Sequence, residues 1–271
     1  MGAMTLLRPY FSCLLALLFS TSEAAAAPTK LAPDVLKHLR EIHAGFNGQE
    51  GSVAQFGDSI TYSMAFWSAM SWSDPSKFLP DDGLPKNPSG KQWKTVIKGA
   101  RDKGQKFANY SGWKVGNLLK SIDTVLARDK PEAALIMIGT NDTNGKKVPE
   151  SYRADLEQVI TKCLAAHCVP ILNTIPPRRD HDKAVEAINL IIHEIATAKK
   201  IPLADFHAEC LRLRPGKTWD GTLISEDGVH PSGGKTNLYD ESNLKSCGYA
   251  LRNWVNFLAY RQVFFGVFEK Q

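Results

Sequence analysis

The sequence predicts an α/β fold in which a doubly wound, mainly parallel sheet of about five strands lies between helices on both faces. Two observations support this prediction. Short apolar runs without polar alternation are typical of strands buried on both faces. Segments with apolar residues at helical spacing fall between those runs. Alternating strands and helices favour parallel strands joined by right-handed crossovers.

The candidate strands are short runs that end at glycine, proline or polar residues. In chain order they are residues 52–56 (SVAQF), 106–110, 133–138 (AALIMI), 169–175 (VPILNTI) and 201–205 (IPLAD). The run at 133–138 is continuously apolar, whereas the run at 201–205 is a weaker strand candidate. The segment 106–110 is expected only as a strand at the edge of the sheet.

The candidate helices are recognised by apolar residues three and four positions apart. Such stripes occur between the strands and at both ends of the chain, at residues 31–43, 118–126, 156–164, 184–195 and 244–260. No internal repeat or low-complexity linker divides the chain, so we expect one domain.

The first residues are expected to direct export. Arg8 precedes an apolar stretch at 10–19, and a small-residue exit follows at 24–27. This order is typical of a secretory signal peptide, and the stretch is shorter than the roughly 20 residues of a membrane span. Cleavage after Ala26 would leave residues 27–271 as a single catalytic domain. We expect a secreted or periplasmic protein without stable membrane insertion; an uncleaved anchor or buried helix is the alternative.

Composition excludes several classes of protein. The chain has 271 residues, of which 43% are hydrophobic and 23% charged, which argues against disorder, collagen or a coiled coil. Lys and Arg number 33 against 28 Asp and Glu, and this excess is modest and spread along the chain. We therefore expect no nucleic-acid partner. The oligomeric state stays open.

Export would place four cysteines in an oxidising compartment, where two disulfides and three connectivities are possible. The preferred pairing is Cys163–Cys168 with Cys210–Cys247. Their spacing fits no zinc template, and the pair His193-Glu194 lacks the second histidine of H-E-x-x-H. We expect no metal and no cofactor.

Polar motifs follow the predicted strands, where ligands of doubly wound sheets bind. The motifs are residues 57–61 (GDSIT), 139–142 (GTND) and 227–231 (DGVHP). Acyl transfer needs a nucleophile, a base and a carboxylate that orients the base. Ser59 can be the nucleophile, His230 can accept its proton, and Asp227 can bond His230 Nδ1.

The same motifs offer donors to the negatively charged oxygen of an acyl-transfer intermediate. The candidates are the backbone N–H groups of Ser59 and Gly112 and the side-chain amide of Asn141. Each motif alone has a structural reading, as a helix cap, a turn or a surface pair. Their joint occurrence at strand ends favours a catalytic site. The elbow pattern G-x-S-x-G of α/β-hydrolases is absent.

These three motifs, in this order, resemble the first, third and fifth sequence blocks of the SGNH (GDSL-type) hydrolases, over residues 52–260. The resemblance implies a flavodoxin-like, three-layer α/β/α sheet and hydrolysis of esters or thioesters. The resemblance implies that Ser59, His230 and Asp227 are the catalytic residues. It also implies that Ser59, Asn141 and the glycine of the second block donate hydrogen bonds to the oxyanion. That second block departs from the family pattern: Gly112 is the assigned glycine, and Gly116 is the alternative.

Tryptophans near the motifs suggest the substrate. Trp113 adjoins the oxyanion glycine, and an indole face there could stack on a sugar ring. We therefore expect an esterase that removes acyl groups, in particular acetyl, from a carbohydrate or a small-molecule ester. A lipase, lysophospholipase or thioesterase with the same triad is the alternative, as is a non-catalytic glycan-binding protein. Acyl transfer to a sugar hydroxyl also stays open.

Overall fold

The computed structural model describes residues 30–73, 75–79, 96 and 99–269. The predicted signal peptide, residues 1–26, lies outside the described residues. Four strands form one parallel sheet in the order β1-β2-β3-β4. They are β1 Gln49–Gly57, β2 Pro131–Met137, β3 Val169–Asn173 and β4 Leu203–Ala204. Every residue of β2 and β3 is buried, as their unbroken apolar runs predict.

The predicted fifth strand at 106–110 is wrong. Residues Gln105–Phe107 form a 3₁₀ turn, and only Asn109 pairs with the sheet, through a parallel bridge to Gly57. The Asn109 side chain donates to the Gln55 carbonyl at 2.8 Å and to the Asp102 carbonyl at 3.1 Å. A side-chain amide therefore satisfies the edge of β1 where a further strand would have continued the ladder.

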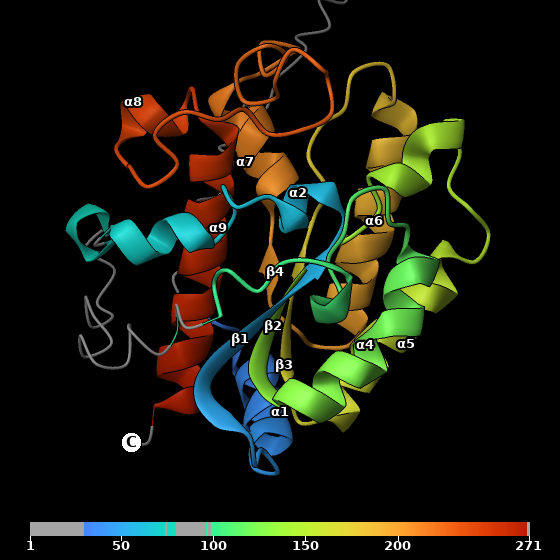
Figure 1. The fold of residues 1–271 in the computed structure, drawn as a ribbon, viewed down its shortest axis with the longest axis vertical. Helices are drawn as coiled ribbons and strands as arrows, with labels where there is room; N and C mark the ends of the chain where they lie inside the picture. The colour runs from blue at the N-terminus through green and yellow to red at the C-terminus, as the bar shows by residue number, and fades with distance from the viewer. Residues whose placement is uncertain (1–29, 74, 80–95, 97–98, 270–271) are drawn as a thin grey trace, which may run out of the picture.

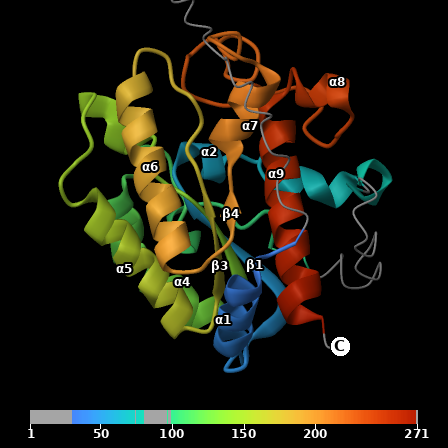
Figure 2. The same ribbon diagram turned by 180° about the vertical axis from the view of Figure 1, so that it is seen from behind.

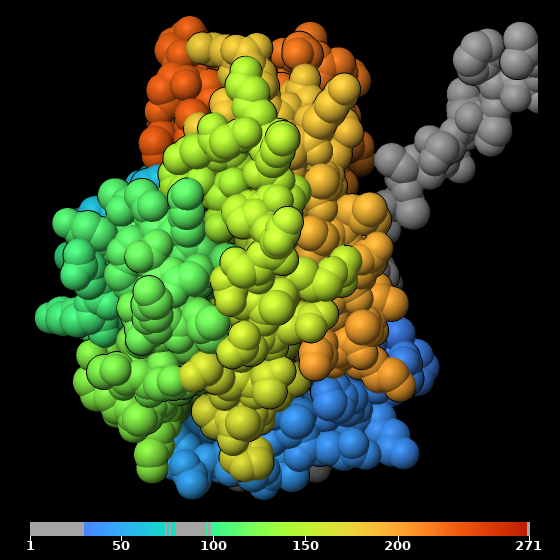
Figure 3. Space-filling model, turned by 90° about the vertical axis from the view of Figure 1, so that its right-hand side faces the viewer, coloured from blue at the N-terminus to red at the C-terminus, as the bar shows by residue number. Residues whose placement is uncertain are grey.

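Helices cover both faces of the sheet, which confirms the predicted α/β class. Figures 1 and 2 show α4, α5 and α6 on one side and α1 and α9 on the other. Their bounds are α1 Pro33–His43, α4 Val115–Asp129, α5 Tyr152–Ala165, α6 Asp182–Ala198 and α9 Gly248–Val263. Figure 3 looks onto the first of these faces, where successive segments of the chain lie side by side.

Three short helices lie near the ends of the sheet or on its periphery. They are α2 Ser59–Tyr62, α7 Phe206–Leu213 and α8 Glu241–Leu244. In Figure 1 the arrow of β1 points at α2. From β1 the chain passes first to the Asn109 bridge and then through α4 to β2. The carboxyl end of β1 therefore lies where the winding of the sheet reverses, the usual place for a ligand site in this architecture.

The preferred disulfide pairing is also wrong in this structure, where all four described cysteines are free and buried. Cys163 lies in the last turn of α5 and Cys168 directly precedes β3, and the Cys168 N–H donates to the Cys163 carbonyl at 3.0 Å. Cys247 Sγ lies 3.7 Å from the Ser232 carbonyl, so a carbonyl oxygen and not Cys210 is its partner. Burial raises the pKa of the Cys168 and Cys210 thiols, which keeps them protonated. These four residues act as small core side chains.

No helix in the described part of the chain has the length and apolar character needed to cross a membrane.

Candidate active site

Ser59 is the first residue of α2 and follows the buried carboxyl end of β1. Asp58 caps this helix, because its Oδ1 accepts from the Ile60 N–H at 3.0 Å. Asp58 is fully buried, and burial raises the pKa of its carboxyl. Asp58 therefore caps the helix while Ser59 occupies the strand-to-helix turn.

Two cations hold the other end of α2. Arg252, fully buried in α9, donates to the Ile60 carbonyl and to Thr61 Oγ1, both at 2.8 Å. Lys103 Nζ donates to the Thr61 carbonyl at 2.8 Å. Positive charge at a helix C-terminus is favourable because the last carbonyl groups carry partial negative charge. Burial lowers the pKa of Arg252 to about 9 and lowers that of Lys103 well below its usual range, so a positive charge at either position has an energetic cost.

The structure brings Ser59, His230 and Asp227 into one chain of hydrogen bonds. Ser59 Oγ lies 2.9 Å from His230 Nε2, and His230 Nδ1 lies 2.6 Å from Asp227 Oδ2. A carboxylate at Nδ1 favours the tautomer with the proton on that nitrogen, which leaves Nε2 free to accept the hydroxyl proton of Ser59. Residues 171 positions apart therefore meet in the order that proton transfer requires.

Asp227 is fixed by more than its histidine. Its Oδ1 accepts from Ser225 Oγ at 2.8 Å and from the N–H groups of Val229 and His230, both at 2.9 Å. Burial alone would raise the pKa of Asp227, but these bonds and the bond to the His230 ring outweigh it and hold the pKa well below its usual range. The carboxylate therefore stays ionised even in acid solution.

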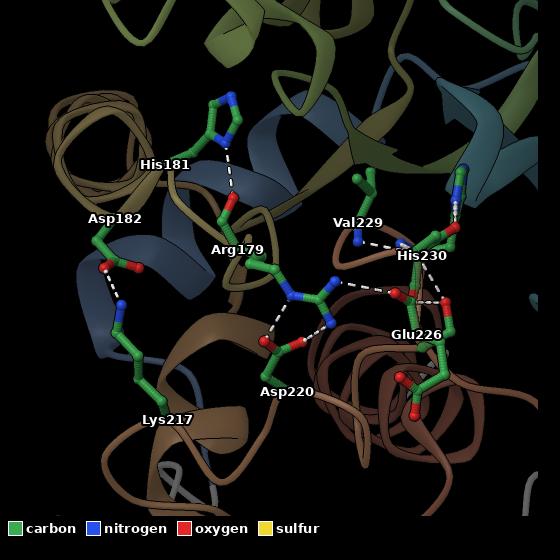
Figure 4. Close-up of polar contacts among 10 residues, drawn as sticks. Arg179, His181, Asp182, Lys217, Asp220, Glu226, Val229 and His230 are labelled. Atoms are coloured by element: carbon green, nitrogen blue, oxygen red, sulfur yellow. Dashed lines mark hydrogen bonds and ion pairs between the residues drawn. The ribbon is translucent and has the colours of Figure 1, made fainter.

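Arg179 braces the loop that carries Asp227 and His230. Figure 4 shows its guanidinium between Asp220 and the Glu226–His230 segment. Nε and Nη2 donate to the two Asp220 oxygens at 2.7 and 2.8 Å, and Nη1 donates to the Glu226 carbonyl at 3.0 Å. The Arg179 backbone N–H bonds the Gly228 carbonyl at 2.9 Å. Gly228 has φ +71°, and a Cβ there would lie 2.7 Å from Arg179 Cβ, so only glycine fits this close approach.

The donors proposed for an oxyanion lie on three neighbouring segments. Asn141 opens a 3₁₀ turn, Asn141–Gly145, after β2, and its Nδ2 donates one proton to the Trp113 carbonyl at 3.0 Å. The second amide proton remains for a ligand. Within the described part of the chain, neither the Ser59 N–H nor the Gly112 N–H has an acceptor in the protein. Gly112 has φ +76° in the turn before α4, whereas Gly116 lies inside that helix.

Arg178 and Asp142 fix the turn that carries Asn141. Arg178 Nη1 lies within 2.8 Å of three oxygens of this turn, namely the Thr140 carbonyl, Thr143 Oγ1 and Asn144 Oδ1. Asp142 Oδ2 accepts from the Val115 N–H at 3.2 Å and so ties the turn to the start of α4. Burial raises the pKa of Asp142 to about 6. Asp142 therefore has a structural role, because it connects the Asn141 turn to α4.

Sequence reasoning missed the residues that support these groups, and for the arginines the reason is that their partners are distant in the chain. Ser225, two residues before Asp227, could have been found, since a hydroxyl near an Asp-x-x-His loop is a short-range signal. Arg178 and Arg179 stand beside a proline pair at a strand end, and nothing local shows which loops they reach. Arg252 lies inside α9, and nothing in the helical pattern around it distinguishes it from an ordinary residue of that helix.

A family model described as the GDSL-like lipase/acylhydrolase family matches residues 56–233. The chain belongs to this family. Membership makes it a hydrolase that acts on ester bonds, with a small-molecule or carbohydrate substrate. The matched region contains Ser59, Gly112, Asn141, Asp227 and His230.

Solved structures with the same fold are distant in sequence. A lipase/acylhydrolase from Enterococcus faecalis is 18% identical, with a TM-score of 0.51, over 81% of this chain and 98% of that one. A G-D-S-L family protein from Desulfitobacterium hafniense DCB-2 is 16% identical, also with a TM-score of 0.51, over 76% of this chain and 98% of that one. No curated protein matches the sequence. The likeness supports the three-layer α/β/α fold.

Proposed function

We propose that this hydrolase is an exported serine esterase that removes acetyl groups from a carbohydrate. The observation that supports it most strongly is the continuous Ser59–His230–Asp227 hydrogen-bond chain, with distances of 2.9 and 2.6 Å. A hydroxyl, a base and an orienting carboxylate in this order form a nucleophile for acyl transfer.

In the proposed reaction Ser59 Oγ attacks the ester carbonyl carbon, and His230 Nε2 accepts the hydroxyl proton. His230 then gives that proton to the departing alcohol oxygen, which leaves the acyl group on Ser59. Water attacks this acyl-enzyme, His230 takes a proton from the water, and the acid and free Ser59 are released. The ionised Asp227 stabilises the imidazolium form of His230 in both halves of the reaction.

The negative charge on the carbonyl oxygen would be met by three donors, the Ser59 and Gly112 N–H groups and the Asn141 amide. Gly112 is preferred over Gly116 because its positive φ requires glycine, whereas the helical position 116 has room for a Cβ. Replacing Asn141 by Ala should lower kcat by about 10²–10³-fold with a smaller change in KM, because its bond strengthens in the transition state. An effect on KM alone would contradict this role.

An open site favours a carbohydrate over a lipid. The side chains of His230 and Asp227 are 39% and 49% exposed, although they would do the chemistry. A long acyl chain needs an enclosed apolar channel to remove it from water. Acetyl is small enough to react without such a channel, while an exposed triad can receive an ester on a bulky polysaccharide.

The test is acetate release from acetylated polysaccharides, measured together with hydrolysis of p-nitrophenyl esters of increasing chain length. The proposal expects a maximum at acetyl and a loss of at least about 10⁴-fold in the Ser59→Ala variant. A maximum at long chains would favour a lipase or thioesterase. Glycan binding without hydrolysis in the natural enzyme would favour a non-catalytic binding protein.

Export is tested separately by the N-terminus of the exported protein. A mature chain that begins at Ala27 is expected from the signal at residues 1–26, and a chain that retains Met1 would contradict it.

A further inference from the structure

Three aromatic residues on segments that adjoin Ser59 contact one another through their rings. The ring centroids of Tyr62 and Tyr110 are 5.3 Å apart, and those of Tyr110 and Trp113 are 6.3 Å apart. Tyr62 and Tyr110 are each 37% exposed, and Trp113 is half-buried against the core. We call these three residues the aromatic strip. A contiguous exposed apolar patch on a protein surface often marks a ligand-binding site.

Each ring of the strip is attached to an element of the proposed catalytic site. Tyr62 is in α2, three residues after Ser59. The Tyr110 N–H bonds the carbonyl of Gly57, two residues before Ser59, at 3.2 Å. The Trp113 carbonyl accepts the Asn141 amide at 3.0 Å. The residues of the strip therefore lie in, or bond to, the segments that carry the nucleophile and the oxyanion donors.

We propose that the aromatic strip is the subsite that holds the sugar ring carrying the ester. This inference rests on the proposed esterase function and adds the residues that would select its substrate. A pyranose has an apolar face of C–H bonds and a rim of hydroxyl groups. Tyrosine and tryptophan match it, because each combines a large apolar face with a polar tip.

The shape of the strip also favours a sugar over an acyl chain. Adjacent rings are tilted by 54° and 59°, so a ligand can stack on the face of one ring while it touches the edge of the next. Two cavities of about 330 and 430 Å³ lie elsewhere, one along the edge of β1 and one beside α1. Neither is lined by Ser59, His230 or a ring of the strip, so neither continues the site as an acyl channel.

Stacking on the strip would stabilise the bound substrate and the transition state by about the same free energy. Loss of a ring should therefore raise KM for an acetylated oligosaccharide more than it lowers kcat. p-Nitrophenyl acetate has no sugar, so the ratio of kcat/KM for the oligosaccharide to that for p-nitrophenyl acetate measures the strip separately from the chemistry.

The experiment measures this ratio in Tyr62→Ala and Tyr110→Ala, with Tyr110→Leu as a second variant that keeps apolar volume. We expect the ratio to fall at least tenfold in each. Trp72→Ala is the matched control, because Trp72 is a 59% exposed aromatic residue outside the strip. An unchanged ratio in the strip variants overturns the inference.

A binding measurement separates this inference from the proposed function. In the Ser59→Ala background, the Kd for an acetylated oligosaccharide should rise at least tenfold when Tyr110→Ala is added. If the natural enzyme hydrolyses neither substrate, the esterase proposal fails. If it hydrolyses both and the strip variants lose only long-chain esters, the strip binds an acyl chain and the sugar subsite is wrong.

Discussion

The helix that carries the nucleophile is held by buried groups, whereas the loop that carries Asp227 and His230 is held by hydrogen bonds at the surface. Helix α2, which begins at Ser59, is fixed by two buried residues. Arg252 donates to the Ile60 carbonyl, and Asp58 accepts from the Ile60 N–H. The loop with His230 lies at the surface and is fixed by hydrogen bonds within five residues and by the exposed Arg179. Buried charges are costly and rigid, whereas surface hydrogen bonds contribute little to stability but can set geometry.

This difference implies that substitutions near α2 should change stability, and substitutions in the loop should change turnover. The Ser59–His230 hydrogen bond joins the two regions.

Replacing His230 should have the largest effect, and almost only on activity. His230→Gln should lower kcat by about 10⁴-fold or more, because it removes the base while keeping a polar side chain. Unfolding free energy should change by less than about 1 kcal/mol, because the side chain is partly exposed at the surface. The control is His193→Gln, since His193 has a similar carboxylate partner, Asp205 at 2.9 Å. Equal activity in the two variants would contradict the role of His230.

Replacing Arg252 should have the largest effect on stability. Arg252→Met leaves the Ile60 carbonyl without its donor and the nearby Asp58 carboxyl without a compensating charge. A loss of about 3–5 kcal/mol in unfolding free energy is expected, measured by urea denaturation. Arg212→Met removes an exposed pair with Glu209 and should cost less than about 1 kcal/mol. The buried-cation account fails if the two variants lose equal stability.

Asp142 should make stability depend on pH. Its folded pKa is raised from 3.8 to about 6, so the folded state prefers the protonated carboxyl. The stability associated with that proton is fully present below pH 4 and is lost as pH rises to about 6. Asp142→Asn keeps an acceptor for the Val115 N–H without charge and should stabilise the protein by up to about 3 kcal/mol above pH 7.

The Asp142→Asn gain should shrink to near zero at pH 4. Urea denaturation at pH 4 and pH 8 measures it, and a gain of equal size at both values would rule out titration of this carboxyl as the cause. Glu157→Gln, on the surface of α5, is a control in which a carboxylate is neutralised at an exposed position.

Arg179 should have the smallest effect, seen in kcat. Arg179→Gln breaks the bidentate pair with Asp220 and the bond to the Glu226 carbonyl, which loosens the loop around His230. We expect a fall of about tenfold in kcat, a smaller change in KM, and a stability loss below about 1 kcal/mol. Arg212→Gln is the control with comparable exposure. A fall in stability without a fall in kcat would show that Arg179 does not position the loop.

The sequence predicts the strands and the catalytic motifs of this molecule better than it predicts the side-chain contacts that hold them in place. The strands β2 and β3 follow from apolar runs, and the motifs beside them from the rule that parallel sheets bind ligands at their carboxyl ends. The strand expected at 106–110 fails because an Asn109 side chain replaces backbone pairing, which no apolar pattern reveals. Likewise Arg252 lies 192 residues from Ile60, so only the folded chain shows their contact.

Covalent labelling of Ser59 tests the central claim most directly. A fluorophosphonate reacts only with a hydroxyl that a neighbouring base activates, and the labelled peptide can be identified by mass spectrometry. The account predicts one adduct per chain, on Ser59, much slower labelling in His230→Gln, and no labelling in Ser59→Ala. Labelling of Ser59→Ala at the rate of the natural enzyme would contradict the account.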